Sequence, residues 1–232
     1  MKKGTFIVIE GTDGSGKATQ AKILEKRLKK EGYKVATFDF PQYFKSSSDF
    51  VKSYLQGRYG SITEVSPKKA SLLYALDRFE AAAEIRAALA EGKIVLANRY
   101  IGSNMGHQGA KIKDAEERLK YFMWDFELEF GVLEIPRPDL NIVLHVPAKI
   151  AQKLVDEKRG KERAYTQGKK RDLHEANLGH LKRAEQTYAE MVRFFPQQFT
   201  LVECAPGGKL RTVEEVAENV WKITAKKLKH KK

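Results

Sequence analysis

A glycine-rich segment between an apolar run and an amphipathic run constrains the fold of this chain more than any other feature. The apolar run covers residues 5–10 (TFIVIE), the segment GTDGSGK follows at residues 11–17, and Ala21, Leu24 and Leu28 recur at helical spacing beyond it. A near-continuous apolar run is typical of a strand buried on both faces, and the spacing beyond the segment indicates a helix. The sequence therefore predicts a strand, a tight loop and a helix in direct succession.

The loop contains the residue types that hold a phosphate group. Its glycines let backbone N–H groups turn toward an anion, and the following helix adds the positive end of its dipole. Lys17 supplies a mobile cation for the β- and γ-phosphate oxygens of a nucleotide. We expect the following residues to bind the phosphates: Gly11, Asp13, Gly14, Ser15, Gly16, Lys17, Ala18 and Thr19.

Position 18 departs from the usual phosphate-loop pattern, which has a Ser or Thr hydroxyl there as a ligand of Mg²⁺. Ala18 has no side-chain oxygen, and the side chain of Thr19 is turned by about 100° around the helix axis. Asp13 lies inside the loop, and Mg²⁺ is commonly held by one or two carboxylates and several waters. We therefore expect the metal ion to be held elsewhere in the site or through water.

The rest of the chain alternates apolar runs with amphipathic stretches. Strands are predicted at residues 5–10, 34–40, 93–98, 140–146 and 199–204. Helices are predicted after the glycine loop, from Pro67 to Gly92, and at residues 114–131, 147–157, 175–193 and 212–227. This alternation predicts an α/β protein: a P-loop NTPase-type five-stranded parallel sheet flanked by helices on both faces. No repeat or composition break divides the chain, so we expect one domain over residues 1–232.

Charge and composition limit the class of partner and the location. The chain has 43 Lys and Arg against 30 Asp and Glu, and the resulting net charge of +13 attracts polyanions. We interpret the basic C-terminal tail, residues 226–232, as a solvated, frayed terminus. No apolar run reaches membrane-spanning length and no secretory signal follows Met1. Because the single Cys204 can form no internal disulfide, we expect a cytoplasmic protein with a buried Cys204.

Residues 156–171 form the densest polar stretch of the sequence. They lie between two predicted helices and contain almost no core residues. The stretch is therefore either a surface excursion or a mobile lid.

Short motifs from residue 5 to about residue 192 resemble those of the thymidylate kinase family. They are EGTDGSGK at 10–17, FPQY at 40–43, LLYALDR at 72–78, NRY with SN at 98–104, GAK at 109–111, PRPDL at 136–140, and RD with Glu175 at 171–175. Their order and spacing together are specific. The resemblance implies transfer of the γ-phosphoryl group of ATP to dTMP with Mg²⁺. It also implies a homodimer, for which the apolar helix from Leu72 to Leu89 could serve.

The resemblance implies roles for residues on the acceptor side. Tyr74 would stack on the thymine ring, and Arg78, one helical turn later, would hydrogen-bond the base, although periodicity alone favours a core aromatic beside a surface Arg. Arg99 would grip the phosphate of dTMP, and Asn104 would contact the base. The remaining expected substrate contacts are Phe40, Pro41, Tyr43, Ser103 and His107, of which His107 lies either near the deoxyribose or toward solvent.

The same resemblance implies catalytic arginines in the polar stretch, because the phosphate loop contains none. The candidates are Arg159, Arg163 and Arg171. Our predicted catalytic residues are Lys17, Arg99, Arg163 and Arg171. Asp13 and Glu175 resemble the acidic pair that holds the metal ion in a subgroup of the family.

Asn98 is a second departure, because the family usually has Asp at this position, where it is expected to orient Mg²⁺ or its water. Asn keeps an oxygen acceptor but lacks the negative charge. Two alternatives stay open: a kinase for another nucleoside monophosphate such as dUMP, and a P-loop protein that binds nucleotide with weakened catalysis. Nucleic acid is the less favoured partner.

Overall fold

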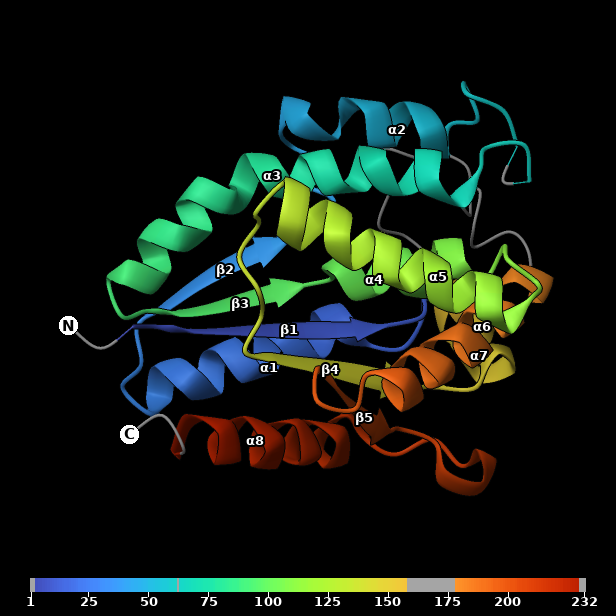
Figure 1. Cartoon of the computed structure of the whole chain (residues 1–232). Coiled ribbons are helices and arrows are strands. Elements are labelled where there is room, and N and C mark those ends of the chain that lie inside the picture. Colours follow the sequence, from blue (N-terminus) through green and yellow to red (C-terminus); the bar gives the residue numbers. More distant parts are fainter. Residues whose placement is uncertain (1–2, 62, 158–177, 230–232) are drawn as a thin grey trace.

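The computed structural model of the chain describes residues 3–61, 63–157 and 178–229. A five-stranded sheet in the order β2-β3-β1-β4-β5 runs through its centre, and every neighbouring pair is parallel (Figure 1). The strands are β1 (Thr5–Gly11), β2 (Val35–Asp39), β3 (Ile94–Asn98), β4 (Leu140–His145) and β5 (Phe199–Glu203). Apart from Gly11 at the end of β1, all strand residues lie inside the predicted ranges, so the predicted fold class is confirmed.

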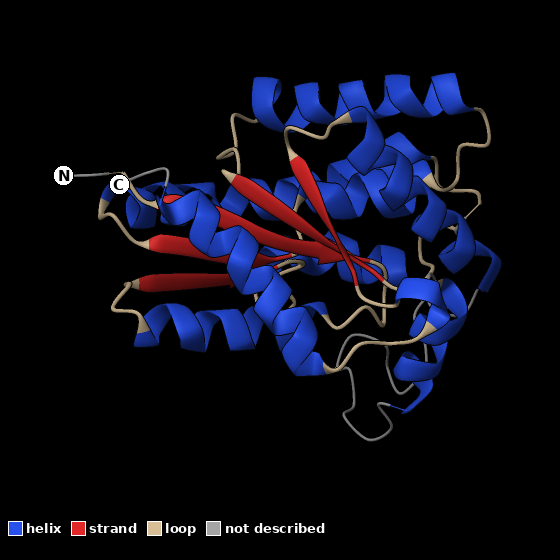
Figure 2. Cartoon of the chain, turned by 90° about the horizontal axis from the view of Figure 1, so that it is seen from below, coloured by secondary structure: helices blue, strands red, loops and turns tan. Residues whose placement is uncertain are grey.

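Helices cover both faces of this sheet (Figure 2). Strand residues such as Ile7 and Ile142 pack against α1, α6 and α8, while Phe6 and Val143 pack against α3, α4, α5 and α7. This division follows from strand geometry, because successive side chains point to opposite faces. The helices are α1 (Lys17–Lys30), α2 (Asp49–Leu55), α3 (Pro67–Ala90), α4 (Ile101–Gly109), α5 (Ala115–Phe126), α6 (Ala148–Glu157), α7 (Leu178–Phe194) and α8 (Val213–Lys229), with short 3₁₀ turns at Ser46–Ser48 and Pro206–Gly208.

The predicted helices are largely confirmed, with local differences. Pro67 begins α3, and the Ser66 side chain caps it by accepting a hydrogen bond from the Lys69 N–H at 3.3 Å. The predicted helix at residues 114–131 consists of α5 and a π-helical turn, η2 (Glu127–Val132). Helix α7 begins at Leu178, and residues 175–177 of the prediction lie outside the described part.

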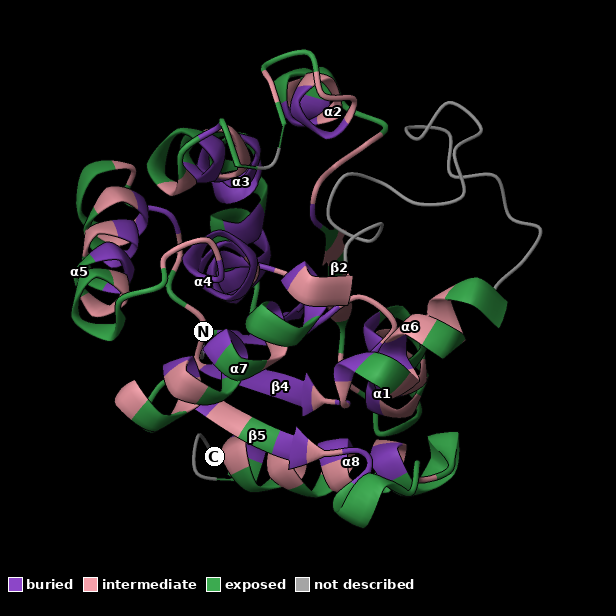
Figure 3. Ribbon diagram, turned by 90° about the vertical axis from the view of Figure 1, so that its right-hand side faces the viewer, coloured by how far each residue is buried: buried purple, intermediate pink, exposed green. Residues whose placement is uncertain are grey.

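The sequence did not predict α2 or α4. Helix α4 contains Gly102, Gly106 and Gly109, and glycine in a helix interior is unfavourable by about 1 kcal/mol relative to alanine. Tertiary packing explains these glycines, since a Cβ atom at Gly106 would lie 2.2 Å from the ring of Tyr188 on α7. Helix α4 forms because its neighbours surround it closely, and Figure 3 shows it almost entirely buried.

Helix α2 lies beside α3, away from the sheet (Figures 1 and 3). It is held by a small separate core in which Val51 and Tyr54 pack with Val65 and Ala70. Across residues 3–61, 63–157 and 178–229, no helix combines the length and apolar character needed to cross a membrane.

Candidate active site

A cavity of about 350 Å³ lies at the carboxyl edge of the sheet, where β1, β2 and β3 end. Ligands of parallel α/β sheets bind at this edge. The cavity brings together residues that are far apart in the sequence, and the predicted site residues that line it are Asp13, Gly14, Gly16, Lys17, Ala18, Phe40, Pro41, Tyr43, Tyr74, Arg78, Arg99, Ser103, Asn104 and His107.

Other predicted residues lie elsewhere. Gly11, Ser15 and Thr19 are not among the residues that line the cavity, and Thr19 is exposed. Arg159, Arg163, Arg171 and Glu175 lie outside the described residues, as does most of the stretch 156–171.

The glycine loop has the backbone geometry of an anion cradle. Gly14 and Gly16 adopt φ angles of 82° and 86°, in the left-handed region where a Cβ is unfavourable. Within the described residues no side chain caps the N-terminus of α1, and its first turn contains no acidic residue. Because the first N–H groups of a helix have no intrahelical partner, this terminus can accept a phosphate.

Lys17 is buried at the start of α1. Its ammonium group donates a 2.7 Å hydrogen bond to the carbonyl of Thr12 and lies 3.9 Å from the Asp13 carboxylate. Both of these contacts lie within the loop itself, and the charge of Lys17 lies at the wall of the cavity.

Arg99 follows the last residue of β3 with a φ angle of 67°, which is uncommon for a residue other than glycine and is typical of functional sites. Its guanidinium forms an ion pair with Asp13 and donates a 3.3 Å hydrogen bond to the Ser103 hydroxyl. Burial opposes the charge of Arg99, but the combined effect of Asp13, Tyr188, Tyr43 and Glu10 raises its pKa above the ordinary value. The arginine is thus a fixed cation that links the loop to α4.

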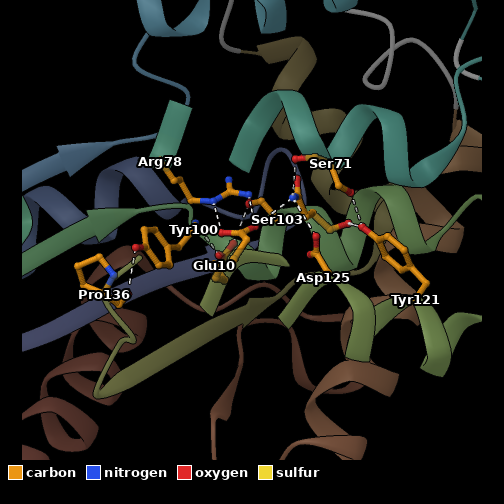
Figure 4. Close-up of polar contacts among 10 residues, drawn as sticks. Glu10, Ser71, Arg78, Tyr100, Ser103, Tyr121, Asp125 and Pro136 are labelled. Atoms are coloured by element: carbon orange, nitrogen blue, oxygen red, sulfur yellow. Dashed lines mark hydrogen bonds and ion pairs between the residues drawn. The ribbon is translucent and has the colours of Figure 1, made fainter. Parts of the chain in front are cut away.

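Glu10 organises the start of α4, a role that the sequence analysis missed. Its carboxylate accepts hydrogen bonds from the Tyr100 N–H at 2.7 Å and from the Ser103 hydroxyl at 2.8 Å (Figure 4). Burial raises the pKa of Glu10, although these hydrogen bonds oppose the shift. A Cβ at Gly102 would lie 2.9 Å from this carboxyl group, so the glycine lets the helix approach it. The only sequence signal was the position of Glu10 directly before the glycine loop.

A buried polar network occupies the other end of the cavity (Figure 4). Arg78 is 2% exposed, and its Nε donates to Glu129 at 2.7 Å while its Nη2 forms a second bond to the same carboxylate. The Asn104 amide donates to Glu129 at 3.2 Å, to the Ser71 carbonyl at 3.2 Å and to Asp125 at 3.3 Å. The expectation of a surface arginine from periodicity alone is wrong.

Asp125 and Glu129 come from the junction of α5 and the π-helical turn η2, an irregularity that often occurs at functional sites. Burial raises the pKa of both carboxyl groups, and the charge of Glu129 raises that of Asp125 further, whereas Arg78 lowers both. Since Glu129 makes two bonds with Arg78, we assign the negative charge to Glu129 and the retained proton to Asp125. Nothing in the spacing of these acids predicted this pairing.

His107 is 7% exposed and lines the cavity, so the alternative of a solvent-facing histidine is wrong. Its ring stacks on His180 with a centroid distance of 5.8 Å. Burial lowers the pKa of His107 to about 3 and that of His180 to about 4. Both rings are therefore neutral at neutral pH.

Asp77 anchors the loop that follows β2. Its carboxylate accepts bonds from the Gln42 N–H at 2.8 Å and from the Ser47 hydroxyl at 2.5 Å. The loop begins with a cis peptide bond between Phe40 and Pro41. Helix α3 thus places Tyr74 and Arg78 in the cavity and also fixes the segment that carries Tyr43.

Asp39 is a further cavity residue to which the sequence analysis gave no role. It ends β2 directly opposite Asn98 of β3, and its carboxylate accepts a 2.7 Å hydrogen bond from the Asn98 amide. Desolvation raises the pKa of Asp39, while the bond from Asn98 opposes the shift. Within the described residues, no group of three or more His, Cys, Asp or Glu side chains could by itself hold a metal ion.

These observations define the class of protein to which the chain belongs. A parallel α/β sheet with a glycine loop between its first strand and first helix, and with a cationic cavity beside that loop, is the architecture of P-loop nucleotide-binding proteins. Residues 9–216 match the family model described as thymidylate kinase. The chain belongs to the thymidylate kinase family, and it is therefore a nucleoside monophosphate kinase.

Individual relatives agree with this membership. The chain is 31% identical over 188 residues to a thymidylate kinase of Mycobacterium tuberculosis, with 80% of this chain and 85% of the relative covered. It is 30% identical over 221 residues to a thymidylate kinase of Leifsonia xyli, with 94% and 93% covered. A solved structure of thymidylate kinase from Candida albicans shares the fold with a TM-score of 0.73 at 22% identity, covering 98% of this chain and 94% of that one.

Proposed function

We propose that this protein transfers the γ-phosphoryl group of ATP to the 5′-phosphate of dTMP, giving ADP and dTDP. Besides family membership, one observation carries the proposal. A single cavity joins the glycine loop, which suits the donor phosphates, to the polar pocket between α3 and α4, which suits a nucleotide base. Donor and acceptor can therefore meet in one cavity, as in-line transfer requires.

The donor phosphates would bind at the glycine loop. The N-terminus of α1, which has no side-chain cap among the described residues, would direct its first N–H groups to the phosphates, and Lys17 would move from the Thr12 carbonyl to the phosphate oxygens. Arg99 lies at the boundary between the two halves of the cavity, where it would neutralise the acceptor phosphate. Two anionic substrates must approach each other during the reaction, and these cations offset their repulsion.

The nucleoside of dTMP would occupy the pocket between α3 and α4. Tyr74 is half-buried at its wall and would stack on the base, with Tyr54 packed edge-on behind it at 6.2 Å. Glu129 fixes Arg78 through Nε and Nη2, and Nη1 forms no hydrogen bond within the described part of the chain. That N–H group can be donated to a base carbonyl. His107, neutral and buried, would contact the deoxyribose.

The donor set at the loop fits a hydrated Mg²⁺ ion. Asp13 lines the cavity, Asn98 Oδ1 is a buried acceptor without a hydrogen-bond partner among the described residues, and Ala18 contributes nothing. Asp13 would hold the ion together with Glu175, for which the sequence is the only support. Bound there, the ion would neutralise charge on the phosphates. The sequence is likewise the only support for Arg163 and Arg171, which we propose as the lid arginines.

We also propose a homodimer formed through α3. Leu72, Leu76 and Phe79 recur along one side of this helix and are 42%, 40% and 48% exposed. A Phe79→Glu substitution should convert the dimer to a monomer in light scattering, whereas Glu80→Gln, at an exposed position of the same helix, should not. A cytoplasmic location remains a proposal that rests on the sequence.

A coupled assay of ADP release tests the proposed reaction. With ATP and Mg²⁺, ADP release should depend on dTMP and exceed the rates with dUMP, dCMP and dGMP. Preference for dUMP would favour the alternative acceptor, to which no comparison points. Nucleotide binding without dTMP-dependent turnover would support the second alternative, a P-loop protein with weakened catalysis.

A further inference from the structure

Asp39 and Asn98 form an isolated polar pair at the carboxyl edge of the sheet. They end the neighbouring strands β2 and β3 in direct register, and both line the cavity beside Lys17 and Ala18. Since a carboxylate only accepts hydrogen bonds, the 2.7 Å contact fixes the Asn98 amide with Nδ2 toward Asp39. Asn98 Oδ1 is left buried and without a hydrogen-bond partner in residues 3–61, 63–157 and 178–229.

Asp39 differs from the other described carboxylates of the cavity. Asp13 is engaged by Arg99 and Lys17, and both oxygens of Asp77 accept hydrogen bonds. Asp39 has one hydrogen bond, from Asn98 to Oδ1, and forms no ion pair within the described residues. Its second oxygen is thus available to a cation or to the water of a hydrated cation.

The second carboxylate oxygen of Asp39 and Asn98 Oδ1 can supply the magnesium-orienting groups that the described part of the same cavity otherwise lacks. Ala18 offers no ligand, and Asn98 has no charge. Mg²⁺ retains several waters and binds proteins through one or two carboxylates, so a carboxylate and an amide oxygen side by side can orient its hydration shell. A charge on β2 can serve a ligand at this edge as well as a charge on β3, because the two strands end at the same place (Figure 1).

We propose that Asp39, paired with Asn98, is a positioning residue that orients the water shell of the Mg²⁺ ion bound with ATP. In this pair the negative charge is on Asp39 at the end of β2, whereas the family usually has it on an Asp at position 98, at the end of β3. This inference rests on the proposed use of Mg·ATP, but not on dTMP as the acceptor.

Binding of a non-hydrolysable ATP analogue, measured by calorimetry with and without Mg²⁺, tests the role of Asp39. The readout is the ratio of the dissociation constant without Mg²⁺ to that with Mg²⁺. Asp39→Asn should lower this ratio about 10-fold or more, as loss of an outer-shell partner commonly does. Affinity without Mg²⁺ should stay equal or rise, because a negative charge near the phosphates has been removed.

Two further variants sharpen the test. The exchange Asp39→Asn/Asn98→Asp keeps one carboxylate and one amide in the pair, and it should restore the ratio to within about threefold of the wild-type value. Asp49→Asn removes a carboxylate that is 65% exposed and does not line the cavity, and it should leave the ratio unchanged.

An unchanged ratio in Asp39→Asn, an equal loss in Asp49→Asn, or no effect of Mg²⁺ on the wild-type protein would overturn the proposal. ADP release with dTMP is measured on the wild-type protein in parallel. Turnover with an unchanged ratio would refute the role of Asp39 and leave the proposed function intact. A lowered ratio without dTMP-dependent turnover would support Asp39 and refute the acceptor.

Discussion

The loop end of the cavity holds its cations by contacts that a ligand can replace, whereas the end between α3 and α4 holds Arg78 in a closed network. Lys17 bonds a backbone carbonyl, and Arg99, 21% exposed, pairs with Asp13. Arg78 and Glu129 are 2% and 0% exposed, and Asn104 and Asp125 surround them. A buried charge needs its partner in the folded protein whether or not substrate is bound.

This contrast indicates that the two ends of the cavity differ in their main contribution, which is to turnover at the loop end and to stability at the end between α3 and α4. Substitutions at the loop end should reduce turnover with little effect on folding, because we propose that the cations there bind phosphate. Substitutions at the network end should reduce stability first, because the buried charge of Arg78 is paired with Glu129 inside the protein. The predictions below test that separation.

Lys17→Met should have the largest effect on turnover. If Lys17 stabilises the transferring phosphoryl group as proposed, its removal should lower kcat by about 10²- to 10³-fold, while the melting temperature changes little. Steady-state kinetics and thermal unfolding of the same preparation check this. Lys22→Met, on an exposed position further along α1, is the matched control and should retain activity. A large loss of stability in Lys17→Met would contradict the separation of tasks.

Glu129→Gln should have the largest effect on stability. Leaving the buried Arg78 charge without its ionic partner should lower the free energy of unfolding by about 3 kcal/mol, measured by urea denaturation. Glu190→Gln removes the partner of Arg118 from a more exposed ion pair. It should lower the free energy of unfolding by about 1 kcal/mol or less. Equal losses in the two variants would show that burial does not set the cost of breaking the pair.

His180 should make a smaller, pH-dependent contribution to the free energy of unfolding. Burial lowers its pKa to about 4, below the ordinary 6.5, so the unfolded chain takes up a proton first as the pH falls. Stability is therefore lost as the pH decreases from about 6.5 toward 4. Between pH 7 and 5, the wild-type protein should lose about 1 to 2 kcal/mol more than His180→Gln in urea unfolding. A difference that does not vary with pH would contradict the buried neutral ring.

Asp125→Asn should have the smallest effect at neutral pH. Burial raises the pKa of Asp125, so the folded protein keeps a proton that the unfolded chain releases above about pH 4. This group therefore makes the free energy of unfolding fall as the pH rises, and the substitution removes that slope. At pH 7 the change should be about 1 kcal/mol or less, because an amide replaces an already neutral carboxyl group. A loss as large as that of Glu129→Gln would show that Asp125 carries the charge.

Prediction from sequence succeeded where the signal is local. The strands, the glycine loop and the start of α3 at Pro67 each depend on a few consecutive residues, and all are confirmed. Helix α4 was missed because its glycines disfavour a helix in isolation. Only the close approach of Glu10, Tyr188 and Phe122 to Gly102, Gly106 and Gly109 explains them. Local propensity is a weak guide where tertiary packing is this tight.

The candidate site divides in the same way. The glycine loop, together with the motifs that resemble those of the thymidylate kinase family, was enough to collect most of the cavity residues. The partners that fix those residues were not visible. Glu10, Asp77 and Glu129 are ordinary acids in the sequence, and their roles appear only when the chain brings them against Ser103, Gln42 and Arg78.

By itself, the sequence determined the phosphate loop and the parallel α/β sheet, because backbone and hydrophobic preferences act within short runs of residues. It indicated the family through motifs that resemble those of thymidylate kinases. Only the tertiary structure decided which polar groups are paired. Arg78 meets Glu129 across 51 positions, and Asn98 meets Asp39 across 59. The physical reason is that a buried charge is stable only beside its partner, and the packing of strands and helices, not their sequence separation, decides which partner that is.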